Sequence, residues 1–251
     1  MTSKQETVLN QIKNGLIVSC QAREGWAMRG SDIMAAFAKA AEEGGAVGIR
    51  ANGEVDIRAI SQKVKLPIIG IRKMWDQDKR VFITPDFESA EKVIEAGASI
   101  VALDGTKRER PNGETLTSII QGIHKNYPDI LVMADISTFE EGVYASDCGA
   151  DIVSTTLCGY TPQTSHIHGF SYELVEQLVR SLTKPIIAEG RIHTKEDAHK
   201  ILEMGCHSIV VGTAITRPEV ITSWYVEELK KKKDFPRPDG QEIKRMYYEK
   251  I

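Results

Sequence analysis

The 251-residue sequence has little cysteine, little excess charge of either sign and no long apolar run. Its four cysteines are widely separated and form no CxxC pair, so we expect reduced, mostly buried thiols. No apolar run approaches the roughly 20 residues of a membrane-spanning helix. The segment from Met1 to Asn14 is polar and lacks the apolar core of a signal peptide. These absences predict a cytoplasmic protein that does not enter a membrane.

The charge balance also limits the classes of partner that the protein is expected to bind. The formal net charge is −3 and the isoelectric point is near 6.1, which argues against a general nucleic-acid binder. Apolar residues make up 41% and charged residues 27% of the chain, as in ordinary globular proteins. A length of 251 residues is typical of one (β/α)8 barrel. We therefore expect a small-molecule partner.

Short apolar runs alternate with amphipathic helical stretches about eight times. Such runs predict buried parallel strands whose outer face is covered by helices. The predicted strands are 16–20, 47–51, 67–72, 100–104, 131–135, 152–156, 185–189 and 208–212. The predicted helices between them are 31–43, 55–64, 86–96, 116–126, 138–148, 172–182 and 195–204, and a further short strand is expected at 81–84. A closed (β/α)8 TIM barrel fits this pattern best, and a doubly wound sheet is the weaker alternative.

No linker divides the chain, so we expect residues 1–251 to form a single barrel domain. The segment 230–251 differs in composition, because it is rich in lysine and proline and carries late aromatic residues. It is expected to be a C-terminal extension that packs on the barrel or on a partner subunit.

Glycines 44, 97, 149 and 205 each stand between a predicted helix and the next strand. Glycine is common there because it can adopt the left-handed conformation that ends a helix. These positions support the assigned boundaries.

Six polar residues are predicted at the carboxyl ends of strands, where barrel enzymes have their active sites. A purely structural barrel has no reason to direct all six to one rim. They are Gln21, Arg50, Lys73, Asp135, Glu189 and Arg217.

The segment His207–Pro218 predicts a phosphate site. Its strand ends in Gly212 and Thr213, and a helix is expected to begin near Pro218. Exposed backbone N–H groups and a helix start attract anions, and Arg217 can add a charge-assisted contact.

Lys73 and Glu189 are the candidate catalytic pair. A free lysine has a pKa of about 10.4 and is a weak base at neutral pH. Burial and a nearby cation such as Arg50 would lower that pKa toward about 7–8, where lysine can move a proton at carbon. Glu189 can polarise a substrate hydroxyl or carbonyl. The structural alternatives are a surface amine beside Arg72 and a rim carboxylate paired with Arg191.

Three further features are better explained by structural roles than by binding or catalysis. His166 and His168 share one loop, but no matching carboxylate cluster indicates a metal site. The charged run 107–110 is typical of a solvated loop, and Asp104 is placed to orient the rim.

The chain resembles the N-acetylmannosamine-6-phosphate 2-epimerases of sialic acid breakdown. The resemblance spans nearly the whole barrel, and its combination of motifs is highly specific. The matching stretches are GLIVSCQA (15–22), GAVGIRANG (45–53), LPIIGIRK (66–73), FITP (82–85), ALDGTKRERPNGE (102–114), MADISTFEEG (133–142), STTLCGYTP (154–162), IIAEGRI (186–192) and VVGTAITRP (210–218).

The resemblance implies reversible inversion at C2 of an N-acetylhexosamine 6-phosphate, by a homodimer without nucleotide, metal or other cofactor. It assigns movement of the C2 proton to Lys73 and an assisting role, through a substrate hydroxyl, to Glu189. The other implied substrate contacts are Gln21, Arg50, Asp135, Gly190, Arg191, Gly212, Thr213 and Arg217.

Two residues depart from the family pattern. Arg72 precedes the lysine where an apolar residue is common, although neighbouring strand side chains point to opposite faces. Its charge is still able to lower the pKa of Lys73. Thr213 stands where glycine is common, and its hydroxyl can donate to phosphate.

Two other functions use the same barrel and phosphate site. A Schiff-base sugar-phosphate aldolase would use Lys73 as its nucleophile. A non-catalytic phosphosugar sensor would bind without turnover, although a sensor needs no base.

Overall fold

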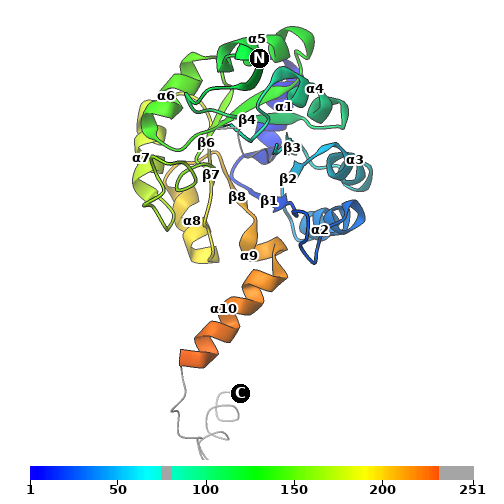
Figure 1. Ribbon diagram of the computed structural model, residues 1–251, viewed down its shortest axis with the longest axis vertical. Helices are drawn as coiled ribbons and strands as arrows, with labels where there is room; N and C mark the ends of the chain where they lie inside the picture. The colour runs from blue at the N-terminus through cyan, green and yellow to red at the C-terminus, as the bar shows by residue number, and fades with distance from the viewer. Residues whose placement is uncertain (75–80, 232–251) are drawn as a thin grey trace, which may run out of the picture. The chain divides into compact units, whose positions relative to one another are not determined.

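The computed structural model describes residues 1–74 and 81–231, and its strands form a closed parallel barrel in the order β1 to β8 (Figure 1). Each strand pairs with its neighbour in sequence, and β8 pairs with β1. The strands are β1 Leu16–Cys20, β2 Gly48–Asn52, β3 Ile68–Ile71, β4 Ile100–Asp104, β5 Leu131–Asp135, β6 Ile152–Ser154, β7 Ile186–Glu189 and β8 Ser208–Val211. The closed barrel confirms the predicted fold and excludes the doubly wound sheet.

Helices alternate with the strands and form an outer ring (Figure 1). The ring helices are α2 Ser31–Glu43, α3 Glu54–Lys63, α4 Phe87–Glu95, α5 Leu116–Asn126, α6 Phe139–Asp147, α7 Tyr172–Ser181 and α8 Lys195–Glu203. A short 3-10 turn, Pro111–Gly113, precedes α5, and α9 Thr213–Thr216 follows β8. Predicted and observed boundaries agree within two residues.

Alternating strand residues face the helices or the barrel interior, as the pleat requires. One apolar cluster contains Ile49, Val101 and Val132 together with helix residues, and a second contains Ile69, Ile100 and other interior residues. Continuing the interior alternation toward the carboxyl ends brings polar residues inward above this apolar layer. They are Ser19, Arg50, Lys73, Asp104, Asp135, Thr156 and Glu189.

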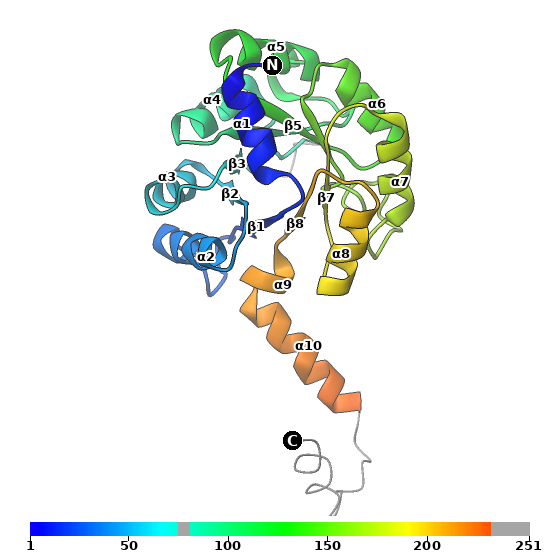
Figure 2. The same cartoon turned by 180° about the vertical axis from the view of Figure 1, so that it is seen from behind.

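An additional helix, α1 (Ser3–Ile12), lies across the barrel at the end where the strands begin (Figure 2). Leu9 and Ile12 are buried in the interior apolar cluster. The Nε2 atom of Gln5 donates to the carbonyl of Ile130, and His207 Nε2 lies 2.8 Å from the Leu9 carbonyl. The polar composition of residues 1–14 did not predict this helix. The signal for it in the sequence is the Thr2–Gln5 capping box, which begins the helix.

Three of the four helix-ending glycines have the expected left-handed backbone, with φ of 97–114° at Gly97, Gly149 and Gly205. The exception is Gly44, where φ is −77°. The left-handed residue at that helix end is Gly45, with φ of 89°. The predicted boundary is right, but the residue that ends the helix is one position later.

The expected short strand at 81–84 forms only an isolated antiparallel bridge, in which Ile83 pairs with Lys73. The bridge is completed by hydrogen bonds from the Met74 amide to the Phe82 carbonyl and from the Thr84 amide to the Arg72 carbonyl, both 2.8 Å long. The segment therefore extends β3 by a few bonds and contributes to the wall of the site.

The chain divides into two compact units, Met1–Arg217 and a second that begins at Pro218. The described part of the second is α10, Pro218–Lys231, on which Tyr225 and Leu229 are more than 70% exposed. The extension predicted over 230–251 falls almost wholly outside the described residues. Over 1–74 and 81–231, none of the helices combines the length and apolarity needed to cross a membrane.

We predict that Gly70→Ala destabilises the barrel. A Cβ at Gly70 would lie 2.4 Å from Val93 Cγ1 and 2.7 Å from the Ala98 Cβ, between β3 and its covering helix. Such overpacking costs about 1–3 kcal/mol, or roughly 2–12 °C in melting temperature for a chain of this size. Gly169→Ala is the control, because a Cβ there meets nothing within 4 Å. Equal melting temperatures of the two variants, measured by calorimetry, would contradict the packing argument.

Candidate active site

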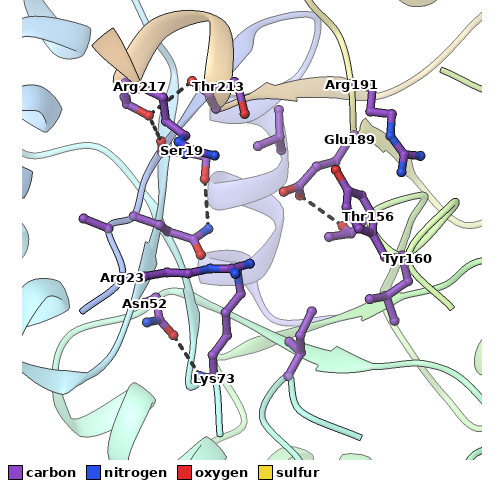
Figure 3. Close-up of a pocket in the computed structure, with 18 of the residues that line it drawn as sticks. Ser19, Arg23, Asn52, Lys73, Thr156, Tyr160, Glu189, Arg191, Thr213 and Arg217 are labelled. Atoms are coloured by element: carbon purple, nitrogen blue, oxygen red, sulfur yellow. Dashed lines mark hydrogen bonds between the residues drawn. The ribbon is translucent and has the colours of Figure 1, made fainter. Parts of the chain in front are cut away.

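A cavity of about 410 Å³ opens at the carboxyl ends of the strands (Figure 3). Its volume is in the range that holds small metabolites. Lys73, Glu189 and Arg217 reach it from different walls (Figure 3). The apolar part of its lining is Phe82, Ile83, Leu157, Ile192 and Val210, and the aromatic part at its edge is Trp26 and Tyr160. The predicted catalytic pair and the predicted phosphate segment therefore share one cavity.

A buried ion network lies beneath this cavity. The Arg50 guanidinium forms a bidentate pair with Asp135, at 3.1 Å from Nη1 to Oδ1 and 2.6 Å from Nη2 to Oδ2. Nη1 also lies 2.8 Å from Glu189 Oε2. The Thr156 hydroxyl lies 2.6 Å from Asp135 Oδ1 and 3.0 Å from Glu189 Oε2, so its single proton can serve either carboxylate. One cation therefore holds two carboxylates that would otherwise repel each other.

The network changes the expected places of two residues. Arg50 lies in the middle of β2 rather than at its end, and Asn52 is the last residue of that strand. The side chains of Arg50 and Asp135 are 1% and 0% exposed, and neither lines the cavity. The expectation of direct sugar contacts by these two residues does not fit this placement. Their partner is Glu189, which is 13% exposed and faces the cavity.

Lys73 has the environment that its predicted role requires. The pKa of Lys73 is lowered from 10.5 to about 8, chiefly by burial and further by the charges of Arg50 and Arg23, while the charges of Glu189 and Asp135 oppose the shift. A substantial fraction of the amine is thus neutral near physiological pH. In contrast to a surface lysine, this group can accept a proton.

The pKa of Glu189 is shifted in the opposite direction to that of Lys73. Burial raises the pKa of Glu189 and the nearby Asp135 charge adds to it, whereas Arg50, the Thr156 hydroxyl and Lys73 lower it. The structural alternative, a rim carboxylate paired with Arg191, is not observed. Glu189 instead pairs with Arg50, as described above.

Arg72 points away from the site. Its Nε lies 3.0 Å from Glu54 Oε1 at the start of α3. The cations that lower the pKa of Lys73 are Arg50 and Arg23. The departure from the family pattern at this position therefore leaves the surroundings of the lysine amine intact.

The predicted phosphate segment contains a short turn of helix that was not expected. This helix, α9, begins at Thr213, directly after Gly212, and the helix expected near Pro218 is α10, which begins at that residue. A Cβ at Gly212 would lie 3.2 Å from the Ser19 Cβ, so a small residue is needed for this close approach. The Thr216 hydroxyl donates to the Ser19 carbonyl at 2.7 Å and fixes the turn against β1.

Thr213 needs no glycine-like backbone, because it is the first residue of α9 and its φ is not in the positive range. Both Gly212 and Thr213 line the cavity. The first backbone N–H groups of a helix have no partner within that helix, so those of α9 are suited to an anion.

Two arginines gather at one indole ring. The Arg217 guanidinium carbon lies 3.8 Å from the centre of the Trp26 ring, and that of Arg23 lies 5.4 Å from it. In stacking on a ring face, a guanidinium uses its flat face and keeps its N–H donors in the plane of the group, pointing away from the ring. Two like charges at the edge of one cavity favour a polyanionic ligand.

Arg191 lines the cavity, and its side chain also has contacts within the protein. Its Nη1 and Nη2 donate to the carbonyls of Cys158 and Gly159, both at 3.0 Å, and its guanidinium carbon lies 4.3 Å from the centre of the Tyr160 ring. Its side chain therefore ties the loop after β6 to β7. Its backbone, with φ of 55°, and that of Gly190, with φ of 111°, turn at the cavity wall.

Gln21 lines the cavity, and its Nε2 donates to the Ser19 hydroxyl at 2.9 Å. Its Oε1 is buried and has no hydrogen-bond partner in the described structure. A buried acceptor without a partner is costly, so this oxygen is available to a ligand donor.

The charged run 107–110 is only partly the solvated loop that we expected, because Lys107 and Glu109 are exposed but the two arginines are not. Arg108 Nη2 lies 2.5 Å from Asp104 Oδ2, and Arg110 is buried and donates to the Pro85 and Asp104 carbonyls. Lys107 alone of these basic side chains is exposed. Asp104 accordingly orders the rim, as its position suggested.

His166 and His168 are exposed. Within 1–74 and 81–231, no three histidine, cysteine, aspartate or glutamate side chains are grouped so that they could hold a metal ion.

Several residues that line the cavity were not predicted from the sequence, chiefly Trp26, Asn52, Thr156 and Tyr160. For Thr156 a signal existed, because it has the same interior alternation as Glu189 and Asp135. The others lie on loops or at strand ends, where pattern does not determine which way a side chain points.

Comparison with known proteins agrees with these observations. A family model described as "Putative N-acetylmannosamine-6-phosphate epimerase" matches residues 34–231. A protein of the same kind from Caldanaerobacter subterraneus subsp. tengcongensis is 52% identical over 91% of this chain and 97% of its own, and one from Cutibacterium acnes is 43% identical over 92% and 100%.

Solved structures give the same result. The N-acetylmannosamine-6-phosphate 2-epimerase from Clostridium perfringens is 44% identical, covers 88% of this chain and 95% of its own, and has a TM-score of 0.84. A thiamine phosphate pyrophosphorylase from Pyrococcus furiosus, at 19% identity and a TM-score of 0.56, shares the fold alone. The match over most of the chain, together with the site described above, shows that this protein belongs to the N-acetylmannosamine-6-phosphate epimerase family.

Proposed function

We propose that this enzyme interconverts N-acetylmannosamine 6-phosphate and N-acetylglucosamine 6-phosphate by moving the proton at C2. The observation that carries the proposal is a lysine with a pKa of about 8 in the same cavity as a buried glutamate and an arginine-flanked turn. Removal of a proton from carbon requires a neutral amine, and binding of a sugar phosphate requires an anion site. The cavity supplies both.

The chemistry starts from the open-chain sugar, in which C1 is an aldehyde and the C2 proton is acidified by it. The neutral Lys73 amine takes this proton, and the electron pair moves onto the C1 oxygen. Placed donors must stabilise the resulting enolate-like species. Return of a proton to the opposite face of C2 completes the inversion.

Glu189 assists rather than replaces Lys73 in this scheme. Its Oε2 is held by Arg50 at 2.8 Å and by the Thr156 hydroxyl at 3.0 Å, which leaves Oε1 for a substrate hydroxyl. Arg50 and Asp135 orient this carboxylate from below the cavity, as positioning residues. Gln21 is proposed to accept a hydrogen bond from the sugar through its unpaired Oε1.

The 6-phosphate is proposed to bind at the α9 turn. The backbone of Gly212 and Thr213, the Thr213 hydroxyl and the Arg217 guanidinium would contact its oxygens, with the backbone of Gly190 and Arg191 at the neighbouring wall. Binding energy from this non-reacting group helps position C2 at Lys73.

We further propose that the enzyme acts in sialic acid degradation, as a cytoplasmic homodimer. Four free, buried cysteines support a reducing compartment. The relatives' names support the substrate.

The direct test of the proposed function is proton NMR of N-acetylmannosamine 6-phosphate with the enzyme in D2O. We expect the C2 proton signal to disappear as N-acetylglucosamine 6-phosphate forms, because the abstracted proton exchanges with solvent. Binding without conversion or exchange would instead indicate a sugar-phosphate sensor. A lysine adduct trapped by borohydride would indicate an aldolase.

Lys73→Met should lower kcat by about 100- to 10 000-fold, the usual contribution of a general base. The phosphate site is untouched, so substrate binding measured by calorimetry should change little. Lys195→Met is the matched control, since that lysine is 92% exposed at the start of α8. Wild-type kcat in Lys73→Met, with the control unchanged, would rule out this base.

The pH dependence of kcat/KM should follow the pKa of Lys73. The amine must be neutral to accept the proton, so kcat/KM rises with pH below about 8 and levels off above it. The charge of Arg23 lowers the pKa of Lys73. Arg23→Met removes that charge, so the pKa of Lys73 and the midpoint of the profile should move to higher pH. A wild-type profile that falls above pH 8 would mean that the protonated lysine is the active form in the free enzyme.

Arg217→Ala should raise KM by about 10- to 100-fold and leave kcat within about threefold, because it removes a contact to a non-reacting group. With N-acetylmannosamine, which lacks the phosphate, the variant and wild type should perform alike. Arg180→Ala, at a side chain 76% exposed on α7, is the control. A fall in kcat with unchanged KM would contradict the phosphate role.

A further inference from the structure

The backbone that carries Lys73 lies just beyond the regular ladder of the barrel. The pairing of β3 with β4 ends at Gly70, and its pairing with β2 ends at Ile71. Lys73 comes two residues after the last of these pairs. Other contacts must therefore hold the residue whose amine we propose to act at C2.

Thr84 supplies two of these contacts, and both are to the residue before the lysine. The Arg72 amide donates to the Thr84 Oγ1 at 3.0 Å, and the Thr84 amide donates to the Arg72 carbonyl at 2.8 Å. Thr84 thus pairs with both backbone groups of Arg72, one through its side chain and one through its own backbone.

Asn52 supplies the next contact along the chain. Its Oδ1 accepts a hydrogen bond of 2.8 Å from the Lys73 amide (Figure 3). On the other side, the Asp104 amide donates to the Ile83 carbonyl at 3.0 Å, which ties the Thr84 segment to β4. The side chains of Asn52 and Thr84, together with the short segment 81–84, thus hold the backbone of Lys73 where β3 no longer pairs with β2 and β4.

The conformation of Thr84 is costly. Its φ is 42°, in the left-handed region that a β-branched residue rarely adopts. It is also completely buried. Such backbone strain persists only where the surroundings impose it, and it gathers at functional sites. Serine and valine would share most of its shape, but of the two only serine keeps the oxygen that Arg72 uses.

We propose that Thr84 is a positioning residue that fixes the backbone of Lys73 through Arg72 and so keeps the amine in place over the substrate. The proposal rests on the proposed function for the identity of the reaction. The hydrogen bonds from Thr84 and Asn52 to the backbone of Arg72 and Lys73, which we call the clamp, are present whatever that reaction is. Thr84 itself does not line the cavity.

The test compares Thr84→Val with Thr84→Ser. Valine keeps the volume and the branched Cβ but leaves the Arg72 amide without its acceptor, whereas serine keeps that acceptor. We expect kcat of Thr84→Val to fall by about 10- to 100-fold, as small displacements of a catalytic group do, with KM changed less than threefold. Thr84→Ser should stay within about threefold of wild type.

Thr115→Val is the control for a purely structural loss. The Thr115 hydroxyl accepts the Ser118 amide at the start of α5, away from the cavity. This variant should lower the melting temperature and leave kcat unchanged. If Thr84→Val behaves in the same way, its role is structural and the proposal fails.

A second readout does not depend on turnover. Labelling of Lys73 by acetic anhydride, followed against pH by mass spectrometry, measures how readily its amine is deprotonated. We expect the labelling midpoint to move to higher pH in Thr84→Val and to stay in place in Thr84→Ser, because a loosened lysine reaches solvent. An unmoved midpoint in Thr84→Val would overturn the proposal.

This design separates the two hypotheses. If the wild-type enzyme does not exchange the C2 proton, the proposed function fails, and the labelling series still tests the clamp. If Thr84→Val does not fold, Asn52→Ala removes the other side-chain bond to the same backbone, and its labelling midpoint should also rise. An unmoved midpoint in folded Asn52→Ala would then contradict the clamp.

Discussion

The site depends on one buried cation, the guanidinium of Arg50. It pairs with Asp135 through two bonds and with Glu189 through a third, in an interior where an unpaired charge would be very costly. Burial alone would lower the pKa of Arg50, but the two carboxylates more than offset this and raise it. The same charge lowers the pKa of Lys73. Arg50 thus affects both members of the proposed catalytic pair, Lys73 and Glu189, without reaching the cavity.

The barrel explains how these groups meet. Interior alternation places an apolar layer at the start of the strands and a polar layer at their carboxyl ends. The helix α1 lies at the apolar end, and the cavity opens at the opposite, polar end. A low-dielectric floor beneath Lys73 and Glu189 strengthens each electrostatic interaction above it. The proposed phosphate site at the α9 turn and the proposed proton transfer at Lys73 then lie on different walls of the same cavity.

Much of this could be predicted from sequence because short apolar runs alternate regularly with amphipathic helical stretches. That pattern predicted the barrel and its boundaries, and the polar residues at the ends of the predicted strands gave the joint location of Lys73, Glu189 and Arg217. The pattern did not place Arg50, because predicting β2 one residue early made a mid-strand residue look like a strand end. Arg191, Trp26 and Thr84 owe their contacts to loops, which local pattern does not position. The α1 helix was missed because only a few apolar residues mark its buried face.

The proposed mechanism requires the Lys73 amine to be easily deprotonated in the folded enzyme. The most direct measurement is the ¹³Cε chemical shift of Lys73 against pH in lysine-labelled wild-type enzyme, assigned by the signal lost in Lys73→Met. The electrostatics described here predict a midpoint near 8. A midpoint near the ordinary value of 10.5 would contradict them, because the lysine would then be a cation throughout the physiological range.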